Sequence, residues 1–503
     1  MAEGVHTLDE RDTTARAVLV DGERIAWIGA EPADAPASDQ RLDLAGAWIT
    51  PSFVDAHVHA TATGLSLTGL NLAGAESLAE ALRRLAEHAA TSTEPVVLGD
   101  GWDDFAWPEG RRPTAADVAR VAPDRIVLLD RVDRHSCVVD PATLAGLPLP
   151  ELDGVDRDAS GNPTGWLRER AGAAARGKVL AQVSARRFQD ARAAACRAAA
   201  ALGIGSLHEM GVPGMYGLDD ALAWMRGAWP VEVLVWWAEL DPDRGPAHGL
   251  RPGGDLFLDG SIGSRTAAVS HGYADGGDGE LFHDDEDVRA FFSACTADGR
   301  GAGVHAIGDR AIEQALSAIE AAAARHGSAA VRRCRHRIEH VELPTRGHVR
   351  RMAALGVVAS VQPAFDATWG GDDQLYARCF GTEVSRRSNP LAWFDAERVI
   401  MAFGSDSTVT PLDPWGAVTA AERHRGGLGL SRRAALHAHT RGGRDVAGQD
   451  EVGPVAAGKR ADLAVWSENP LAVEDPRGLD CLATVVQGRG VYGDLPLAAT
   501  HDA

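Results

Sequence analysis

The fold is organised around a short apolar run that ends in two histidines, Pro51-Ser52-Phe53-Val54-Asp55-Ala56-His57-Val58-His59. An apolar run of this length that follows a proline is typical of a buried strand. Side chains alternate along a strand, so His57 and His59 leave it on the same face. Two imidazoles on one face of a rigid strand end form half of a site for a divalent metal ion. The pair alone is equally consistent with two ordinary polar residues at a strand exit.

The composition is that of a soluble globular protein and limits the partners to be expected. The chain has 503 residues, of which 45% are hydrophobic and 24% charged, and a formal net charge of −21. This length suits roughly two or three domains. The negative charge argues against nucleic acids and anionic membranes, which both need basic surfaces, so we expect a small-molecule substrate.

Neither the first residues of the sequence nor its cysteines point to secretion. The segment from Met1 to Thr14 is polar and lacks the apolar core of a signal peptide, and no stretch reaches transmembrane length. The six cysteines form no C-x-x-C pair and no disulfide framework. We therefore expect a cytoplasmic protein.

Both ends of the chain contain short strand patterns. Residues 17–20 and 24–28 flank Asp21-Gly22, which is a strong hairpin signal, and residues 461–466 and 483–489 read as further strands. Each terminal segment is too small to fold alone, so the two should pair. We predict one β-sandwich domain built from residues 1–50 and 450–503.

The residues between the two ends alternate helical and strand patterns, which is typical of βα units around a parallel sheet. We predict a fold of the α/β class, a (β/α)8 barrel over residues 51–449 with a loop insertion around 62–170. Polar residues lie where the predicted strands end: His57 and His59, His305, His340 and Asp406. In such a barrel the carboxyl ends of the strands converge on the active site. Four histidines and an aspartate suit a divalent ion such as zinc.

Several phrases of the sequence resemble the amidohydrolase superfamily, and within it amidohydrolase family 3, which includes N-substituted formamide deformylases. The phrases are the opening run, His305-Ala306-Ile307-Gly308-Asp309-Arg310-Ala311, Arg337-Ile338-Glu339-His340, Gly404-Ser405-Asp406, Asp259-Gly260-Ser261-Ile262-Gly263-Ser264-Arg265 and Ala457-Gly458-Lys459-Arg460-Ala461-Asp462-Leu463. The resemblance runs from about Ala17 to Gly488. It implies that His57, His59, His305, His340 and Asp406 bind the metal, and dimers are frequent in this superfamily, so a homodimer is compatible with it.

The chain departs from the family pattern at one position. Many members carry a carboxylated lysine on strand four that bridges two metal ions, and the matching residue here, four before Asp259, is Asp255. The only lysines are Lys178, in a predicted helix, and Lys459, near the far end. A lysine bridge is therefore not expected, and we favour one ion over two. The alternative is that a carboxylate, Asp255 or Glu209, takes the place of the lysine, and Glu209 could also lie behind a metal ligand.

Three further residues are candidates for substrate contacts: His135, Arg265 and Trp102. Arg265 could instead hold its glycine-rich loop, and Trp102 could instead pack in a core. Two other histidine patterns are read as structural. His437 and His439 lie in a helical stretch, where residues two apart diverge, and His336 lies too far below His340 on the same strand.

The predicted reaction is hydrolysis of a non-peptide C–N bond, in a linear amide or an N-substituted formamide. The resemblance implies a metal-activated water, with Asp406 as general base and then acid and with His340 assisting at the oxyanion. One alternative is a heterocycle deaminase or cyclic-amide hydrolase that uses the same site. Another is a catalytically degenerate member that binds a ligand, although retention of all five ligands argues against it.

Overall fold

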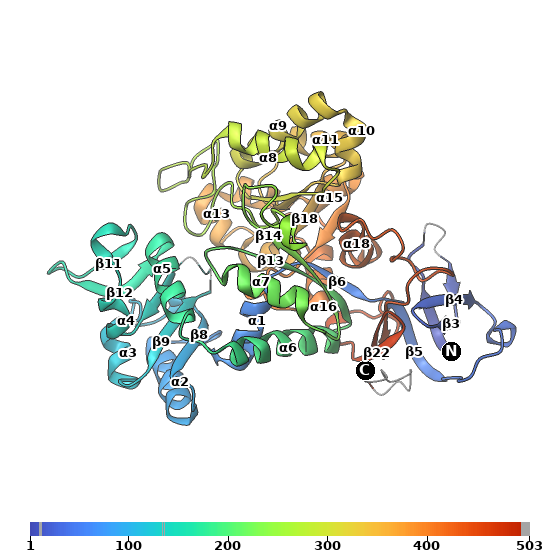
Figure 1. Ribbon diagram of the computed structural model, residues 1–503, viewed down its shortest axis with the longest axis horizontal. Helices are drawn as coiled ribbons and strands as arrows, with labels where there is room; N and C mark the ends of the chain where they lie inside the picture. The colour runs from blue at the N-terminus through green and yellow to red at the C-terminus, as the bar shows by residue number, and fades with distance from the viewer. Residues whose placement is uncertain (10–12, 133, 135, 494–503) are drawn as a thin grey trace.

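The computed structural model describes residues 1–9, 13–132, 134 and 136–493. It has an α/β fold with three regions along its long axis (Figure 1): a central region of parallel sheets, a lobe formed by an inserted sheet, and a sheet that combines both ends of the chain. Separate clusters of buried apolar side chains lie in the three regions. Among the described residues, no helix is long and apolar enough to cross a membrane.

The terminal sheet joins strands from both ends of the chain. Its order is β2-β1-β5-β20-β21-β22. Strand β5 pairs antiparallel with β20, with Ile49 opposite Val465. The predicted hairpin at Asp21-Gly22 is present as β3 and β4. The bounds are β1 Ala2–His6, β2 Thr14–Ala15, β3 Ala17–Asp21, β4 Arg24–Gly29, β5 Leu44–Pro51, β20 Leu463–Trp466, β21 Cys481–Val486 and β22 Arg489–Tyr492.

The central region contains two parallel four-stranded sheets, ordered β15-β14-β13-β6 and β16-β17-β18-β19. Every residue of β6 is buried, as the apolar run in the sequence predicted. The bounds are β6 Phe53–Val58, β13 Ile204–Gly211, β14 Glu232–Trp237, β15 Arg251–Pro252, β16 Gly303–Ala306, β17 Arg337–His340, β18 Val358–Val361 and β19 Met401–Phe403.

Backbone hydrogen bonds connect the two parallel sheets at both of their edges. After β19, the Asp406 amide donates to His57 O at 2.8 Å, and the His59 amide donates to Ser407 O at 3.0 Å. After β15, the His305 amide donates to Leu256 O at 2.9 Å, and the Leu258 amide donates to His305 O at 3.0 Å. These bonds hold the end of β19 beside the end of β6, and β16 beside the segment that contains Asp255.

The segment of residues 255–259, which the family resemblance places on strand four, does not form a continuous strand. Only Phe257 forms a β-bridge there, with His305. Gly253 and Gly254, just before it, have φ values of +76° and +82°, which interrupt extended backbone. A Cβ atom on Gly253 would lie 2.0 Å from Gly303 O, so glycine permits the close approach to β16.

The segment expected as a loop insertion around 62–170 contains a sheet of its own, ordered β11-β12-β10-β9-β8-β7. The local pattern of β8 and β9 resembles that of barrel strands because they also form a parallel pair within βα units. The strand bounds are β7 Leu70–Asn71, β8 Val96–Trp102, β9 Ile126–Arg131, β10 Ser136–Val139, β11 Val155–Arg157 and β12 Pro163–Arg168. Its helices are α2 Leu78–Thr91, α3 Ala115–Val121, α4 Pro141–Ala145 and α5 Glu169–Leu180.

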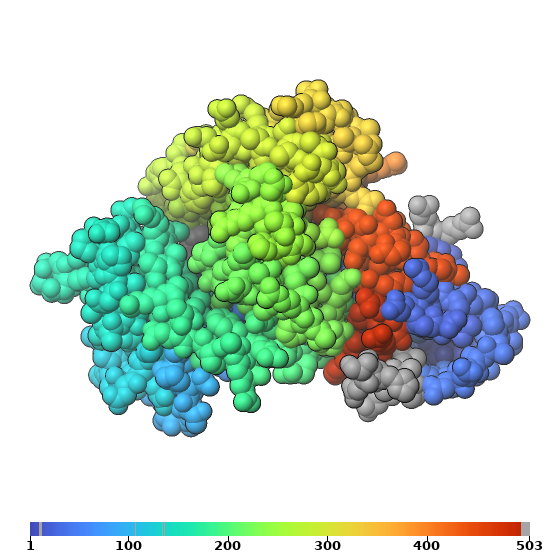
Figure 2. All heavy atoms as spheres, in the orientation of Figure 1, coloured from blue at the N-terminus to red at the C-terminus, as the bar shows by residue number. Residues whose placement is uncertain are grey.

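The remaining helices belong mainly to the central region, and the inserted and terminal sheets project from it on opposite sides in the space-filling view (Figure 2). Helix α1 starts directly after His59, and the Ala- and Arg-rich helix α6 is capped by Ser184. The bounds are α1 Ala60–Thr68, α6 Ala185–Ala201, α7 Gly217–Arg226, α8 Asp285–Ala297, α9 Asp309–His326, α10 Ser328–Cys334, α11 Arg346–Leu355, α12 Pro363–Trp369, α13 Leu375–Phe380, α14 Thr382–Arg387, α15 Leu391–Ala396, α16 Pro414–Glu422, α17 Arg432–His437 and α18 Gly443–Val446.

Candidate metal centre

Six buried side chains with metal-ligating atoms meet at the carboxyl ends of the parallel strands. They come from β6 and the start of α1, from the segment after β15, from β16 and β17, and from the loop after β19. They are His57, His59, Asp255, His305, His340 and Asp406. The sequence predicted that five of them lie together, and Asp255 joins them.

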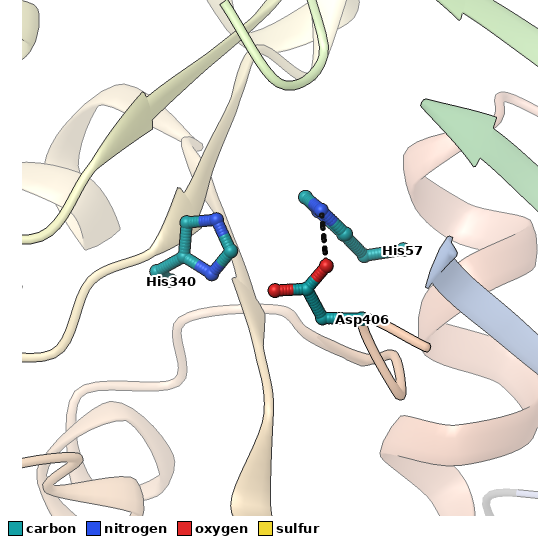
Figure 3. A group of neighbouring side chains, drawn as sticks. All are labelled: His57, His340 and Asp406. Carbon is teal, nitrogen blue, oxygen red and sulfur yellow. Dashed lines mark ion pairs between the residues drawn. The ribbon is translucent and has the colours of Figure 1, made fainter. Parts of the chain in front are cut away.

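Asp406 faces the two histidines of the opening run. Its Oδ1 atom lies 3.5 Å from His57 Nε2 and 3.3 Å from His59 Nε2. Figure 3 shows Asp406 between His57 and His340, with all three side chains directed at one point. Their ligand atoms lie within 4.8 Å of one another, the spacing of a group that could hold a metal ion.

Asp255 lies among all four histidines. Its Oδ2 is 3.4 Å from His59 Nε2, and its Oδ1 is 3.9 Å from His57 Nε2. The same Oδ1 is 3.1 Å from His305 Nδ1 and 3.4 Å from His340 Nε2. Asp255 therefore belongs to two further groups that could hold a metal ion, one with His57 and His59 and one with His305 and His340.

Hydrogen bonds behind the site orient each imidazole. His57 Nδ1 donates to Glu339 Oε2 at 2.8 Å, and His340 Nδ1 donates to Gln362 Oε1 at 2.9 Å. His59 Nδ1 donates to Met210 O at 3.1 Å. His305 Nε2 faces Gly260 O at 3.4 Å. The remaining ring nitrogen of each histidine is left facing Asp255, and this is how metal-ligating histidines are held in proteins.

The acceptor behind His57 is itself held by a buried arginine. Glu339 forms an ion pair with Arg337, whose Nη2 atom also donates to Ser360 Oγ at 2.7 Å and to Ala56 O at 2.5 Å. Burial alone would raise the pKa of Glu339, but the Arg337 guanidinium and His57 lower it to about 2. Glu339 is therefore an anion at neutral pH and keeps the proton of His57 on Nδ1.

The charges of the site favour positive charge at its centre. Burial alone would lower the pKa of His340, but its hydrogen bond to Asp255 and the charge of Asp406 raise it to about 9. Burial would likewise raise the pKa of Asp406, but the nearby histidines hold it below its ordinary value. Either protons on the imidazoles or a bound cation could supply this positive charge. The two are alternatives, because a metal cation displaces such protons when it binds.

The donor set fits a divalent metal ion. His57 Nε2 and Asp406 Oδ1 are buried and have no hydrogen-bond partner among the described residues. Buried polar atoms are nearly always paired, so unpaired ones at a cluster of donors point to a ligand. Imidazole nitrogen and carboxylate oxygen are the ligands that zinc prefers outside thiolate sites.

Two of the donors lie in left-handed backbone. His340 has φ +71° and Asp406 has φ +51°, each just beyond or at the end of its strand. Non-glycine residues rarely adopt this conformation, and such strain concentrates at functional sites.

The other predicted candidates lie elsewhere or are held by other contacts. Glu209 accepts from the Ala60 amide at the start of α1 at 2.5 Å and belongs to none of the three donor groups. Burial and the charge of Asp220 raise the pKa of Glu209 to about 8. Arg265 pairs with Asp275 at 3.1 Å within its own loop, which matches the loop-holding alternative for this side chain.

Trp102 is fully buried in the inserted sheet, where its Nε1 donates to Leu129 O at 3.0 Å. Its position corresponds to the packing alternative and does not support a substrate contact. His135 lies outside the described residues. His439 Nδ1 donates to Val54 O behind β6 at 3.0 Å, and His336 bonds to Thr296 at 3.0 Å, so neither joins the centre.

Sequence reasoning did not single out Glu339 or Gln362. Signals for both were present. Arg337 and Glu339 are opposite charges two residues apart on one short strand, which puts them on the same face. Gln362 directly follows β18, at the same end of its strand as His340 of β17.

Comparison with known proteins agrees with this geometry, since a model of the amidohydrolase family matches residues 40–492. The chain belongs to this family. As the motifs predicted, it is therefore a hydrolase of carbon–nitrogen bonds. Putative amidohydrolase YtcJ of Bacillus subtilis (strain 168) is 28% identical, with 97% of this chain and 98% of that protein aligned.

Two further similarities bear on this amidohydrolase. The N-substituted formamide deformylase of Arthrobacter pascens is 26% identical over 96% of each chain. The crystal structure of an uncharacterized metal-dependent hydrolase from Pyrococcus furiosus superposes with a TM-score of 0.74 at 25% identity, covering 93% of this chain and 98% of the other. The amidohydrolase described here thus shares its fold with a metal-dependent hydrolase over nearly its whole length.

Proposed function

We propose that this amidohydrolase uses a bound zinc ion to hydrolyse a linear amide or an N-substituted formamide. One observation carries the proposal: Asp406, with an unpaired buried Oδ1, faces the Nε2 atoms of His57 and His59 at 3.5 and 3.3 Å. The similarity to an N-substituted formamide deformylase favours the formamide as substrate class.

The residues of the centre have separate roles in this proposal. His57, His59 and Asp406 would hold one ion, and His305 and His340 lie next to them, against Asp255. When bound, a zinc ion lowers the pKa of a coordinated water and polarises the substrate carbonyl. Asp406 would take the proton of the attacking water and pass it to the departing amine. His340 would help to stabilise the oxyanion that develops on the substrate carbonyl oxygen.

Substitution of Asp406→Asn tests these roles. The amide has the same shape but cannot accept the proton, so kcat should fall by about 10²- to 10⁴-fold, the usual contribution of general acid–base catalysis. The measurement is turnover of a panel of N-substituted formamides and acyl-amino acids, with circular dichroism to verify the fold. Wild-type rates in the variant would contradict the role of Asp406.

Adding amino-heterocycles and cyclic imides to this panel separates the alternative reactions. Ammonia release from an amino-heterocycle, or opening of a cyclic imide, with no cleavage of linear amides would favour the deaminase or cyclic-amide alternative. A purified chain that takes up no zinc and cleaves nothing would favour the degenerate alternative. Cleavage of formamides alone would support the proposal.

We also propose the finer architecture and setting. The hydrogen bonds that connect the two parallel sheets support one closed (β/α)8 barrel over residues 51–449. The pairing of β5 with β20 supports a sandwich domain of residues 1–50 and 450–503.

All six cysteines lie among the described residues and form no disulfide, which suits the reducing cytoplasm. A small-molecule substrate and a homodimer remain predictions, the latter testable by light scattering.

A further inference from the structure

Asp406 begins a tight turn that also contains Thr408. The Val409 amide donates to Asp406 O at 2.7 Å, and this bond closes the turn around Ser407 and Thr408. The four residues share one hydrogen-bonded ring, so a displacement of Thr408 is passed to Asp406 through the backbone. Whatever holds the Thr408 side chain therefore also bears on the direction of the Asp406 carboxylate.

The turn is held by two regions of the molecule. The central region holds its backbone, since the Asp406 amide donates to His57 O at the end of β6 at 2.8 Å. The Thr408 side chain is held by the inserted lobe, which comprises β7 to β12 and α2 to α5. Arg134, which follows β9 in this lobe, donates from Nε to Thr408 Oγ1 at 2.6 Å. A charged donor makes this hydrogen bond stronger than one between neutral groups.

The position of Arg134 is itself fixed within the lobe. Its Nη1 donates to Asp130 Oδ2 at 3.1 Å, and its Nη2 pairs with Asp100 Oδ2 at 3.1 Å. Arg176 of α5 donates to Asp130 Oδ1 at 2.7 Å and to the Arg134 carbonyl oxygen at 2.6 Å. Both the guanidinium and the backbone of Arg134 are thus held, so its reach toward Thr408 is fixed as well.

A purely structural role of this cluster explains only part of its contacts. Asp100 and Asp130 lie opposite each other at the carboxyl ends of β8 and β9, where like charges repel. The two aspartates and the two arginines are only 8–17% exposed, so each charge needs a partner. This need accounts for Nη1 and Nη2 of Arg134. It does not account for Nε, which donates out of the lobe to Thr408.

We infer that Arg134 is a positioning residue for the hydrolytic reaction: through Thr408, it fixes the direction of the Asp406 carboxylate. This inference rests on the proposed role of Asp406 as proton acceptor. Misplacement of a catalytic group by about 1 Å can reduce the rate by about 10²-fold, so a remote contact of this kind can control kcat. The inserted lobe is in this sense a part of the active site.

Two substitutions of Thr408 test the hydrogen bond. Thr408→Val keeps the shape of the side chain and removes the acceptor, whereas Thr408→Ser keeps the hydroxyl. On a formamide that the wild type cleaves, kcat should fall by about 10- to 100-fold in Thr408→Val and stay close to wild type in Thr408→Ser. KM should change little in both variants, because Asp406 acts in the chemical step.

Arg134→Met removes the donor and should reproduce the kcat of Thr408→Val. The double variant should be no slower than the slower single variant, because both substitutions remove the same bond. Arg125→Met is the matched control. Arg125 precedes the opposite end of β9 and donates to Ala89 O and Ser92 O at 2.8 Å, so its loss should leave kcat unchanged.

Hydrogen–deuterium exchange of residues 404–410 in the full-length protein is a second measurement, and it requires neither metal nor substrate. Release of the turn should make its amides exchange faster. Exchange should therefore be faster than wild type in Arg134→Met and Thr408→Val, and unchanged in Thr408→Ser and Arg125→Met.

Wild-type kcat and exchange in a folded Thr408→Val variant overturn the inference, even when Arg134→Met fails to fold. Equal losses of kcat in Thr408→Val and Thr408→Ser also overturn it, since the hydroxyl would then have no role. Wild-type turnover by Asp406→Asn would instead contradict the proposed role of Asp406. The exchange measurement would still decide whether Arg134 holds the turn, so the two failures are distinguishable.

Discussion

At the scale of single residues, the centre depends on a chain of buried contacts behind its ligands. Arg337 holds Glu339, and Glu339 holds the Nδ1 proton of His57. Arg337 and Glu339 are almost completely buried, so each charge relies on the other for compensation. The orientation of the first ligand thus comes from a residue that does not itself face the metal position.

Replacing Glu339 by glutamine should weaken metal binding. The amide can still accept from His57, but Arg337 loses its anionic partner. We expect zinc affinity to fall by about 10- to 100-fold and the free energy of unfolding to fall by about 3–5 kcal/mol. Competition with a chromophoric chelator measures the first quantity, and urea unfolding measures the second.

A surface pair provides the control for this substitution. Glu320 bonds to Arg351 at 2.7 Å but is largely exposed. Glu320→Gln should leave zinc affinity unchanged and cost at most about 1 kcal/mol. Unchanged zinc affinity in a folded Glu339→Gln variant would show that the buried pair does not orient His57.

At the scale of elements, one partly buried carboxylate connects β14 with the segments that lead into the terminal sheet. Glu232, at the start of β14, pairs with Arg444 of α18 and with Arg460 just before β20. Burial alone would raise the pKa of Glu232, but the two arginines lower it to about 2. The central region and the terminal sheet are therefore joined by charge as well as by apolar packing.

This network predicts a pH dependence of stability. The pKa of Glu232 is about 2 in the folded chain, below its ordinary value of 4.5, so its contribution is present above pH 4.5 and is lost as the pH falls toward 2. Glu232→Gln should lower the free energy of unfolding by about 3 kcal/mol near pH 6, and the difference from wild type should shrink below pH 4.5. Urea unfolding between pH 6 and 3 measures it. A difference that does not change with pH would contradict this role.

At the scale of the whole molecule, the terminal sheet supports the strand that carries the histidine pair. Strand β5 leads directly into β6, and Trp466 of β20 packs at this junction. The Trp466 ring contacts Phe53 with centroids 5.7 Å apart and Trp415 at 5.1 Å, and its Nε1 donates to Thr50 Oγ1 at 2.9 Å. Residues more than 400 positions apart thus form the base of β6 together.

Truncation of this tryptophan should destabilise the whole protein. Trp466→Ala leaves a large cavity at the junction of β5 and β6. We expect the free energy of unfolding to fall by about 3–5 kcal/mol and the Tm to decrease. Leu482→Ala, on the neighbouring strand β21, removes a side chain that is 46% exposed and should cost about 0.5 kcal/mol or less. Calorimetry of both variants measures the difference. Equal Tm values in the two variants would contradict the supporting role of Trp466.

The sequence by itself determined the features that local patterns carry. The alternation of His57 and His59, the polar residues at the ends of β16 and β17 and after β19, and the hairpin at Asp21-Gly22 could all be read from neighbours in the chain. Hydrophobic periodicity and turn chemistry are short-range properties, so the sequence exposes them directly.

Only the tertiary structure decided which side chains meet. Asp255 lies among four histidines from three strands and the start of α1, and the outer hydrogen bonds choose which nitrogen of each ring faces it. Residues 70–168 form a separate sheet that buries Trp102, although their local pattern matched that of barrel strands. Such contacts depend on distances between residues far apart in the chain, and no local pattern encodes them. The lysine missing from the sequence suggested a simpler centre, whereas the fold places a carboxylate between two sets of ligands.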